Sequence, residues 1–86
     1  MAHILIVEDD INLGQILFQE LKKHNHVVEL VENAEAALAR VNKYIYDLLV
    51  TDLKLPGMDG IELLKKIKGA NQSTMVIVMT GYASVD

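Results

Sequence analysis

Short apolar runs alternate with longer amphipathic stretches along this chain. The runs are rich in β-branched residues and predict four strands, which are His3 to Val7, Val27 to Val31, Asp47 to Thr51 and Met75 to Thr80. In the stretches between them, apolar residues recur at intervals of three and four, which is the spacing of one helix face. The pattern therefore predicts the order β-α-β-α-β-α-β.

Each intervening stretch carries one apolar stripe. The stripes are Leu13, Ile16, Leu17 and Leu21, then Ala34, Ala37, Leu38 and Val41, and finally Ile61, Leu64 and Ile67. Helix-start signals agree with them, because Asn33 can cap the second helix and Asp59 with Glu62 forms a capping box for the third. Gly69 stands where the third helix is expected to end. We expect each helix to pack its stripe on a sheet.

The strand segments are continuously apolar, as in "ILIV", "LLV" and "VIVM". Such runs suit strands that are buried on both faces of a parallel sheet. Right-handed crossovers leave few ways to connect these elements. We predict an α/β fold with a flavodoxin-like, doubly wound parallel sheet in the order 2-1-3-4, and we predict that residues 1–86 belong to one domain.

Composition narrows the classes of function. The chain has 8 Lys+Arg against 12 Asp+Glu, a net charge of −4, which argues against nucleic-acid binding by this segment because phosphate contacts need a basic face. It has no cysteine, which excludes disulfides and thiolate-metal sites. No run approaches the roughly 18 apolar residues of a membrane helix, and no secretory leader is visible. We expect a cytoplasmic protein that does not enter the membrane.

Acidic residues follow two strands that the predicted sheet makes neighbours. Glu8, Asp9 and Asp10 follow the first strand, and Asp52 follows the third. The carboxyl ends of these strands meet where the winding reverses, which is the ligand-binding edge of such sheets. Clustered carboxylates repel one another unless a cation lies among them, and oxygen ligands without His or Cys favour Mg²⁺. We predict a Mg²⁺ site there, with Asp10 better explained as a helix cap.

Three blocks of sequence carry a family resemblance. They are "ILIVEDD", "DLLVTDLKLPGMDGIELLKKIK" and "VIVMTGYAS". In order and spacing, the chain resembles the receiver domain of two-component response regulators. The resemblance implies that Asp52 accepts a phosphoryl group from a sensor histidine kinase, and that the segment is a signalling domain, not an enzyme. The ending "MTGYASVD" is most similar to receivers of transcriptional activators, which implies a DNA-binding output domain elsewhere.

The resemblance also implies roles for individual residues. Asp9 and Asp52 would bind Mg²⁺ directly, Glu8 would act through metal-bound water, and the backbone carbonyl of Lys54 would supply a further ligand. The hydroxyl of Thr80 would move to bind the phosphoryl group. Physical chemistry agrees, because a carboxylate attacks an anionic phosphoryl group only when a cation offsets their repulsion.

Other classes of protein fit the chain less well. A phosphatase of the haloacid-dehalogenase type needs a second acid two residues after its nucleophile, where this chain has Lys54. A flavodoxin-like cofactor binder needs a Gly/Ser/Thr-rich phosphate loop after the first strand, where Glu8 and Asp9 would repel the phosphate. The alternative that stays open is a receiver-like protein-interaction module that is not phosphorylated, because no lysine before Asp86 matches the one that receivers carry on their fifth strand.

A full receiver continues through a fourth helix, a fifth strand and a fifth helix. The resemblance therefore implies a domain that is incomplete at its C-terminus, with Met75 to Met79 as a sheet edge that offers unpaired backbone groups. We expect the chain either to pair this edge with a second copy, as a homodimer, or to be part of a longer polypeptide. In the first case Val78→Lys is expected to dissociate the homodimer.

Overall fold

The computed structural model describes residues 1–70 and 73–79, and its elements follow the predicted order. These elements are β1 (His3–Val7), α1 (Ile11–Lys23), β2 (Val27–Val31), α2 (Ala34–Lys43), β3 (Leu48–Asp52), α3 (Gly60–Ala70) and β4 (Met75–Met79). The predicted bounds of β1 and β2 are confirmed. Strand β3 begins one residue later than predicted, although Asp47 already donates its N–H to the His3 carbonyl at 2.8 Å.

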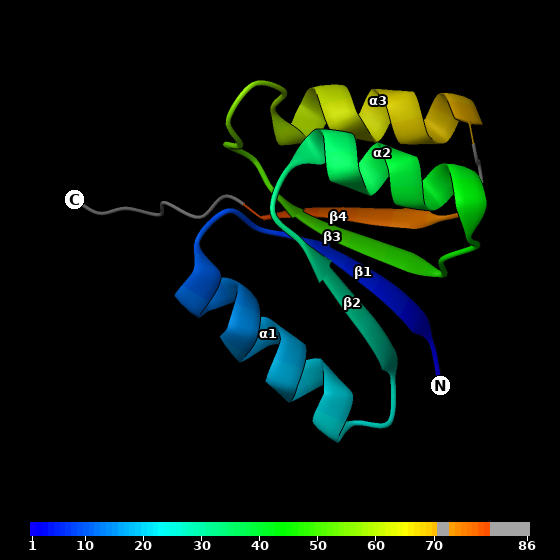
Figure 1. Cartoon of the computed structure of the whole chain (residues 1–86). Helices are drawn as coiled ribbons and strands as arrows, with labels where there is room; N and C mark the ends of the chain where they lie inside the picture. Colours follow the sequence, from blue (N-terminus) through cyan, green and yellow to red (C-terminus); the bar gives the residue numbers. More distant parts are fainter. Residues whose placement is uncertain (71–72, 80–86) are drawn as a thin grey trace.

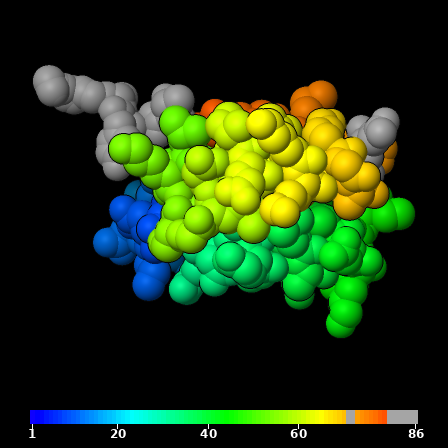
Figure 2. Space-filling model, turned by 90° about the horizontal axis from the view of Figure 1, so that it is seen from above, coloured from blue at the N-terminus to red at the C-terminus, as the bar shows by residue number. Residues whose placement is uncertain are grey.

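The four strands form one parallel sheet in the order β2-β1-β3-β4, which confirms the predicted topology. Helix α1 lies on one face of this sheet, and α2 and α3 cover the other (Figure 1). In a view onto that second face, α2 and α3 lie side by side (Figure 2). Val7 of β1 is paired with Thr51 of β3, so both strands end at the same edge of the sheet.

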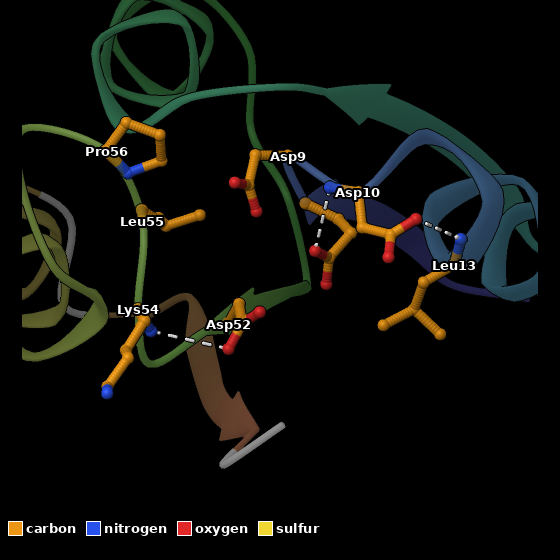
Figure 3. Close-up of a pocket in the computed structure, with 8 residues that line it drawn as sticks. Asp9, Asp10, Leu13, Asp52, Lys54, Leu55 and Pro56 are labelled. Atoms are coloured by element: carbon orange, nitrogen blue, oxygen red, sulfur yellow. Dashed lines mark hydrogen bonds between the residues drawn. The ribbon is translucent and has the colours of Figure 1, made fainter. Parts of the chain in front are cut away.

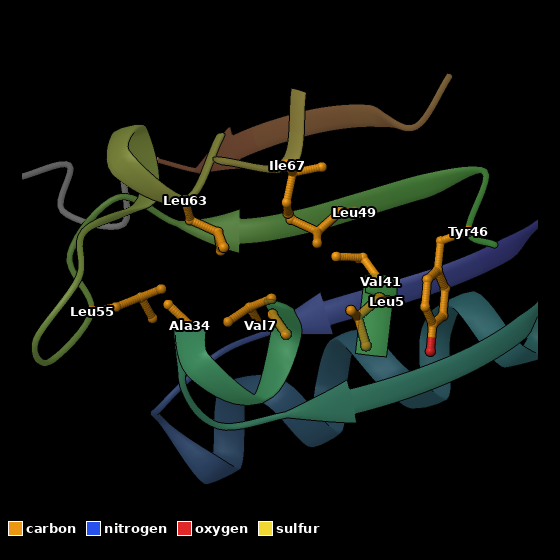
Figure 4. Close-up of a cluster of buried hydrophobic side chains, with 10 residues drawn as sticks. Leu5, Val7, Ala34, Val41, Tyr46, Leu49, Leu55, Leu63 and Ile67 are labelled. Atoms are coloured by element: carbon orange, nitrogen blue, oxygen red, sulfur yellow. The ribbon is translucent and has the colours of Figure 1, made fainter. Parts of the chain in front are cut away.

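Two apolar clusters hold the layers together. The larger lies between the sheet and helices α2 and α3 (Figure 4), and its buried members are Leu5, Val7, Ala34, Ala37, Val41, Tyr46, Leu49, Leu55, Leu63 and Ile67. The smaller lies under α1, where Leu17, Phe18 and Leu21 pack against buried Ile4 and Ile6. Burying such side chains stabilises the fold by about 1.5–3 kcal/mol each. The central strand β1 therefore contributes to both clusters.

The predicted stripe is right for α2 and partly wrong for the other two helices. In α1, Ile16 is 65% exposed, because the face that meets the sheet runs through Gly14, whose added β-carbon would lie 3.1 Å from a Leu30 methyl carbon. In α3, Ile61 is 42% exposed, whereas Leu63 is fully buried. Both helices present a glycine to the sheet, at Gly14 and Gly60, and a stripe that counts only large apolar residues gives these positions no weight.

Capping residues begin the helices as predicted. The carboxylate of Asp10 accepts from Leu13 N at 3.1 Å, and the Asn33 side chain accepts from Ala36 N at 2.8 Å. The carboxylate of Asp59 accepts from Glu62 N at 2.8 Å. Helix α3 ends at Ala70, one residue beyond the expected stop. Among the described residues, no helix is long and apolar enough to cross a membrane.

A polar cluster ties the edge strand β2 to its neighbours, and sequence reasoning missed it. Glu29 Oε1 accepts from Arg40 Nη2 at 2.5 Å and also from the Tyr46 hydroxyl, and Glu29 Oε2 lies 3.3 Å from His3 Nε2. Burial opposes ionisation of Glu29, but the hydrogen bonds from Tyr46, Arg40 and His3 outweigh it and lower the Glu29 pKa. Burial and the Glu29 carboxylate raise the pKa of Tyr46 to about 12.

Replacing Glu29 by glutamine is expected to destabilise the fold at pH 7 by about 1–3 kcal/mol, because it weakens charge-assisted hydrogen bonds. Since the folded-state pKa of Glu29 is lowered, its contribution is full above the unfolded-state pKa and is lost as pH falls through the folded-state value. Urea unfolding of wild type and Glu29→Gln at pH 7 and at acid pH measures both effects.

A matched control is Glu20→Gln on α1, where the Glu20 side chain is 60% exposed and lies 3.5 Å from Lys23 Nζ. Exposed ion pairs contribute little, so this variant is expected to stay within about 0.5 kcal/mol of wild type at both pH values. A Glu29→Gln effect that is the same at neutral and acid pH would contradict the assignment to the ionised carboxylate.

Candidate functional site

A pocket of about 500 Å³ opens at the edge of the sheet where β1 and β3 end. The segment after β1 and the segment after β3 form its walls (Figure 3). Its lining residues are Glu8, Asp9, Asp10, Leu13, Asp52, Lys54, Leu55 and Pro56. The predicted acidic residues are therefore in one pocket, at the edge that the topology indicates.

Three carboxylates converge in this pocket. Glu8, Asp9 and Asp52 each offer one oxygen atom, and these atoms all lie within 4.8 Å of one another. Asp10 lines the same pocket, but its carboxylate accepts the hydrogen bond that caps α1. The structure thus brings together the three acids of the predicted Mg²⁺ site and confirms that Asp10 is a cap.

Glu8 is the most constrained of the three acids. It is 1% exposed, and burial raises its pKa, as do the charges of Asp52 and Asp9, while the hydrogen bond from Asp10 N opposes the shift. That bond, of 3.1 Å, uses Oε2. The other oxygen, Oε1, is buried and has no hydrogen-bond partner among the residues that the structure describes.

An unpaired buried carboxylate oxygen costs free energy unless a hydrogen-bond donor, a proton or a cation satisfies it. The set of ligand atoms available here consists of carboxylate oxygens only, with an open pocket beside them. Hard oxygen ligands that leave room for water suit Mg²⁺. The residues present therefore fit a Mg²⁺ ion, and the orphaned oxygen of Glu8 is the observation that supports this fit.

Asp52 is the last residue of β3 and is half-buried in the pocket wall. Its Oδ1 accepts from Lys54 N at 3.3 Å, so the backbone that follows the strand contacts the carboxylate itself. The next residue, Leu53, donates its N–H to the Met79 carbonyl at 2.8 Å and extends the pairing with β4. A strand end fixed in this way holds the carboxylate in the pocket.

The loop from β3 to α3 is anchored at several points. Leu55 is buried in the large apolar cluster, and Gly60 N donates to the Leu53 carbonyl at 2.8 Å. Gly57 has φ +83°, a conformation that favours glycine because it has no β-carbon. The motif "LPGMDG" therefore forms a well-anchored loop that connects the pocket to helix α3.

Some predicted site residues are not tested by this geometry. Thr80 lies outside the described residues, and the role of the Lys54 carbonyl as a metal ligand stays a prediction. Sequence reasoning missed Leu13 as a residue of the pocket wall, because its spacing assigned it to the sheet-facing stripe. Its position three residues after the capping Asp10 could have placed it near the acids.

Comparison with known proteins gives consistent matches. Residues 4–86 match the family model of the response regulator receiver domain. The transcriptional regulatory protein ZraR of Klebsiella oxytoca is 43% identical over 83 residues, which cover 96% of this chain and 19% of that protein. The chain therefore spans about a fifth of the length of that curated relative.

Solved structures agree with the sequence matches. The response regulator protein TrrA from Thermotoga maritima, in complex with Mg²⁺-BeF, has a TM-score of 0.90 and 31% identity over 96% of this chain and 72% of that one. TrrA in complex with the histidine kinase ThkA has a TM-score of 0.89 and 31% identity over 98% of this chain and 72% of that one.

Mg²⁺ is expected to raise the melting temperature of this protein, because a ligand that binds only the folded state stabilises it. At about ten times the dissociation constant, linkage gives about 1.4 kcal/mol, or roughly 6–11 °C for a domain of this size. Asp52→Asn is expected to melt at a higher temperature than wild type without metal, because it removes one of three repelling charges, and to respond less to Mg²⁺. Thermal melts with and without Mg²⁺ measure these differences.

Asp10→Asn is the matched control, because it removes a charge from the same pocket, while an asparagine can still cap α1. Its response to Mg²⁺ is expected to stay close to that of wild type. A wild-type melting curve that is indifferent to millimolar Mg²⁺ would count against a shared site of Asp9 and Asp52.

Proposed function

The chain belongs to the response regulator receiver domain family, and we propose that Asp52 is its phosphoacceptor, modified by a sensor histidine kinase in two-component signalling. The observation that carries this proposal is the convergence of three carboxylates in one pocket, with a buried oxygen of Glu8 left unpaired. The proposal places residues 1–86 within a single receiver domain, in line with the family match over residues 4–86. Its output is a signal to another domain, not the turnover of a substrate.

We assign Asp9, Asp52 and the Lys54 carbonyl to hold Mg²⁺, with Glu8 acting through metal-bound water. The chemistry that Mg²⁺ supplies when bound is the neutralisation of negative charge on the carboxylate and the phosphoryl oxygens. Glu8 and Asp9 supply the negative charge that attracts the cation, and they alone would repel a phosphoryl group. The three acids therefore act together, and none of them suffices singly.

The Asp52 carboxylate is the nucleophile of the transfer. One of its oxygens forms a bond to phosphorus while the bond between phosphorus and the imidazole nitrogen of the kinase's phosphohistidine breaks. The electron pair of that bond stays on the imidazole, which takes a proton from solvent and leaves as the neutral ring. The hydrogen bond from Lys54 N to Oδ1 restricts the rotation of the carboxylate. A carboxylate that is already oriented loses less entropy when the transition state forms.

Readout of the modification is assigned to Thr80, whose hydroxyl binds a phosphoryl oxygen through a charge-assisted hydrogen bond. The name of the relative ZraR, a transcriptional regulatory protein, supports an output in transcription through a DNA-binding domain. We also propose homodimerisation through the β4 edge. The exposed apolar side chains of β4 support it, since Met75 is 64% exposed and Ile77 is 46% exposed.

The kinase is proposed to dock on helix α1. Leu13 lines the pocket, and Ile16 lies one helical turn further on, 65% exposed. A phosphodonor that reaches Asp52 comes close to Leu13, because both residues line the same pocket. Exposed apolar side chains next to a reactive site are typical of a protein interface. The structure of TrrA with the histidine kinase ThkA shows that a protein with this fold can form a complex with a kinase.

With Mg²⁺ and acetyl phosphate, the wild type is expected to gain one phosphoryl group that hydroxylamine removes, because an aspartyl phosphate is an acyl phosphate. Asp52→Asn is expected to gain none, since an amide is a poor nucleophile toward phosphorus. Intact-protein mass spectrometry measures the modification. Asp59→Asn is the control, because asparagine keeps the cap of α3 and the residue lies outside the pocket lining.

Equal modification of wild type and Asp52→Asn would refute the assignment of the phosphoacceptor. A wild type that binds Mg²⁺ but is never modified, by acetyl phosphate or by a kinase, would favour the protein-interaction module instead.

Ile16→Glu is expected to lower phosphotransfer from a purified histidine kinase that phosphorylates the wild type, by about tenfold or more, because it places a charge in the proposed interface. Its modification by acetyl phosphate is expected to stay unchanged, because the small donor needs no docking surface. Ile61→Glu is the control, because Ile61 is an exposed isoleucine on α3, at 42%. Equal losses in both variants, or in both assays, would contradict docking on α1.

A further inference from the structure

Gly60 begins α3 directly behind the end of β3. A β-carbon at this position would lie closer than 3.0 Å to the Asp52 carbonyl oxygen, a distance that real β-carbons essentially never show. It would also lie 3.1 Å from Leu53 Cα and 3.2 Å from the Asp52 carbonyl carbon. All three neighbours are backbone atoms, so no side-chain rotation relieves the overlap. A side chain at position 60 therefore forces either α3 or the end of β3 to move.

Helix α3 has little freedom to move away. Leu63 and Ile67, on the same face as Gly60, are fully buried in the large apolar cluster. Well-packed cores resist displacement because shifted side chains lose contacts or overlap. Part of any shift must therefore fall on the segment from Asp52 to Lys54, and both of these residues line the pocket.

A single peptide unit links Gly60 to the Asp52 carboxylate. The Leu53 carbonyl accepts from Gly60 N at 2.8 Å, and the N–H of the same peptide unit, which belongs to Lys54, donates to Asp52 Oδ1 at 3.3 Å. A peptide unit is planar and rigid, so fixing its carbonyl end also fixes its N–H end. The backbone of Gly60 thus orients the peptide that contacts the carboxylate.

We propose that Gly60 is a positioning residue of the pocket, which orients the Asp52 carboxylate and the Lys54 backbone toward Mg²⁺ and the phosphoryl group. This inference rests on the proposed function, because it concerns the same pocket. Gly60 touches neither ion nor phosphoryl group and acts through the peptide between Leu53 and Lys54. Only glycine allows the helix start to approach β3 closely enough for its N–H to hold that peptide.

Gly60→Ala tests the inference with Mg²⁺ alone as the probe. The Mg²⁺ dissociation constant, from the melting temperature as a function of Mg²⁺ concentration, is expected to rise about tenfold or more, as for other residues that orient metal ligands. Modification by acetyl phosphate at saturating Mg²⁺ is expected to slow as well. A cooperatively folded Gly60→Ala that binds Mg²⁺ as tightly as wild type would overturn the proposal.

Two variants on the same helix serve as controls. Gly69→Ala adds a methyl group at a position where a β-carbon meets nothing within 4 Å, and its Mg²⁺ affinity is expected to equal that of wild type. Asp59→Ala removes the cap of α3 and is expected to lower the melting temperature without changing Mg²⁺ affinity. If Asp59→Ala weakens Mg²⁺ binding as much as Gly60→Ala, the role of Gly60 is helix initiation alone and the proposal fails.

Hydrogen exchange in the wild type decides the question if Gly60→Ala does not fold. Saturating Mg²⁺ is expected to slow exchange of the Gly60 N–H by a larger factor than that of the Leu63 N–H, which reports on stabilisation of α3 as a whole. Equal slowing of both amides would overturn the proposal. These measurements need no phosphoryl transfer, so a protein that binds Mg²⁺ but is not phosphorylated would refute the proposed function alone.

Discussion

The parallel pairing of β1 with β3 is the constraint on which the rest of the structure depends. It sets Val7 opposite Thr51, so the residues that follow, Glu8 and Asp52, emerge side by side at one edge of the sheet. Right-handed crossovers then require α1 and α2 to lie on opposite faces, which leaves an opening between the segments after β1 and β3. Residues 44 positions apart in sequence thereby share one pocket.

The arrangement of carboxylates in that pocket is electrostatically unfavourable, and the surrounding structure maintains it. Three acids within 4.8 Å repel one another and would separate if their strands were free to move. The apolar clusters on both faces of β1 keep the strands together, and the Gly60 contact keeps the end of β3 in place. Stability contributed by the core thus maintains an arrangement that a bound cation or the protonation of an acid relieves, as is common for functional sites.

The sequence predicts the features that local patterns determine. The bounds of β1 and β2, the order 2-1-3-4 and the convergence of Glu8, Asp9 and Asp52 all follow from periodicity and from the rules for parallel sheets. The exposed face of α1 did not follow, because which of two adjacent apolar faces is buried depends on the glycine that packs against Leu30. The bonds of Glu29 to Arg40 and Tyr46 join β2 to α2 and to the loop before β3, and no local pattern indicates them.

Two glutamates of this fold show how hydrogen-bond partners distinguish an acid that stabilises the fold from an acid of the candidate metal site. Both are at least partly buried, and burial opposes ionisation in both. Around Glu29, three donors outweigh burial and lower the pKa, so its charge stabilises the fold until the pH falls through that value. Around Glu8, burial and the charges of Asp52 and Asp9 outweigh the one hydrogen bond from a backbone N–H and raise the pKa of Glu8. The ionised form of Glu8 therefore lowers the stability of the fold as the pH rises through the folded-state pKa. The first glutamate is satisfied by donors of its own chain, whereas the second has a buried oxygen without a hydrogen-bond partner among the described residues, which a proton, a water molecule or a cation from solution can satisfy.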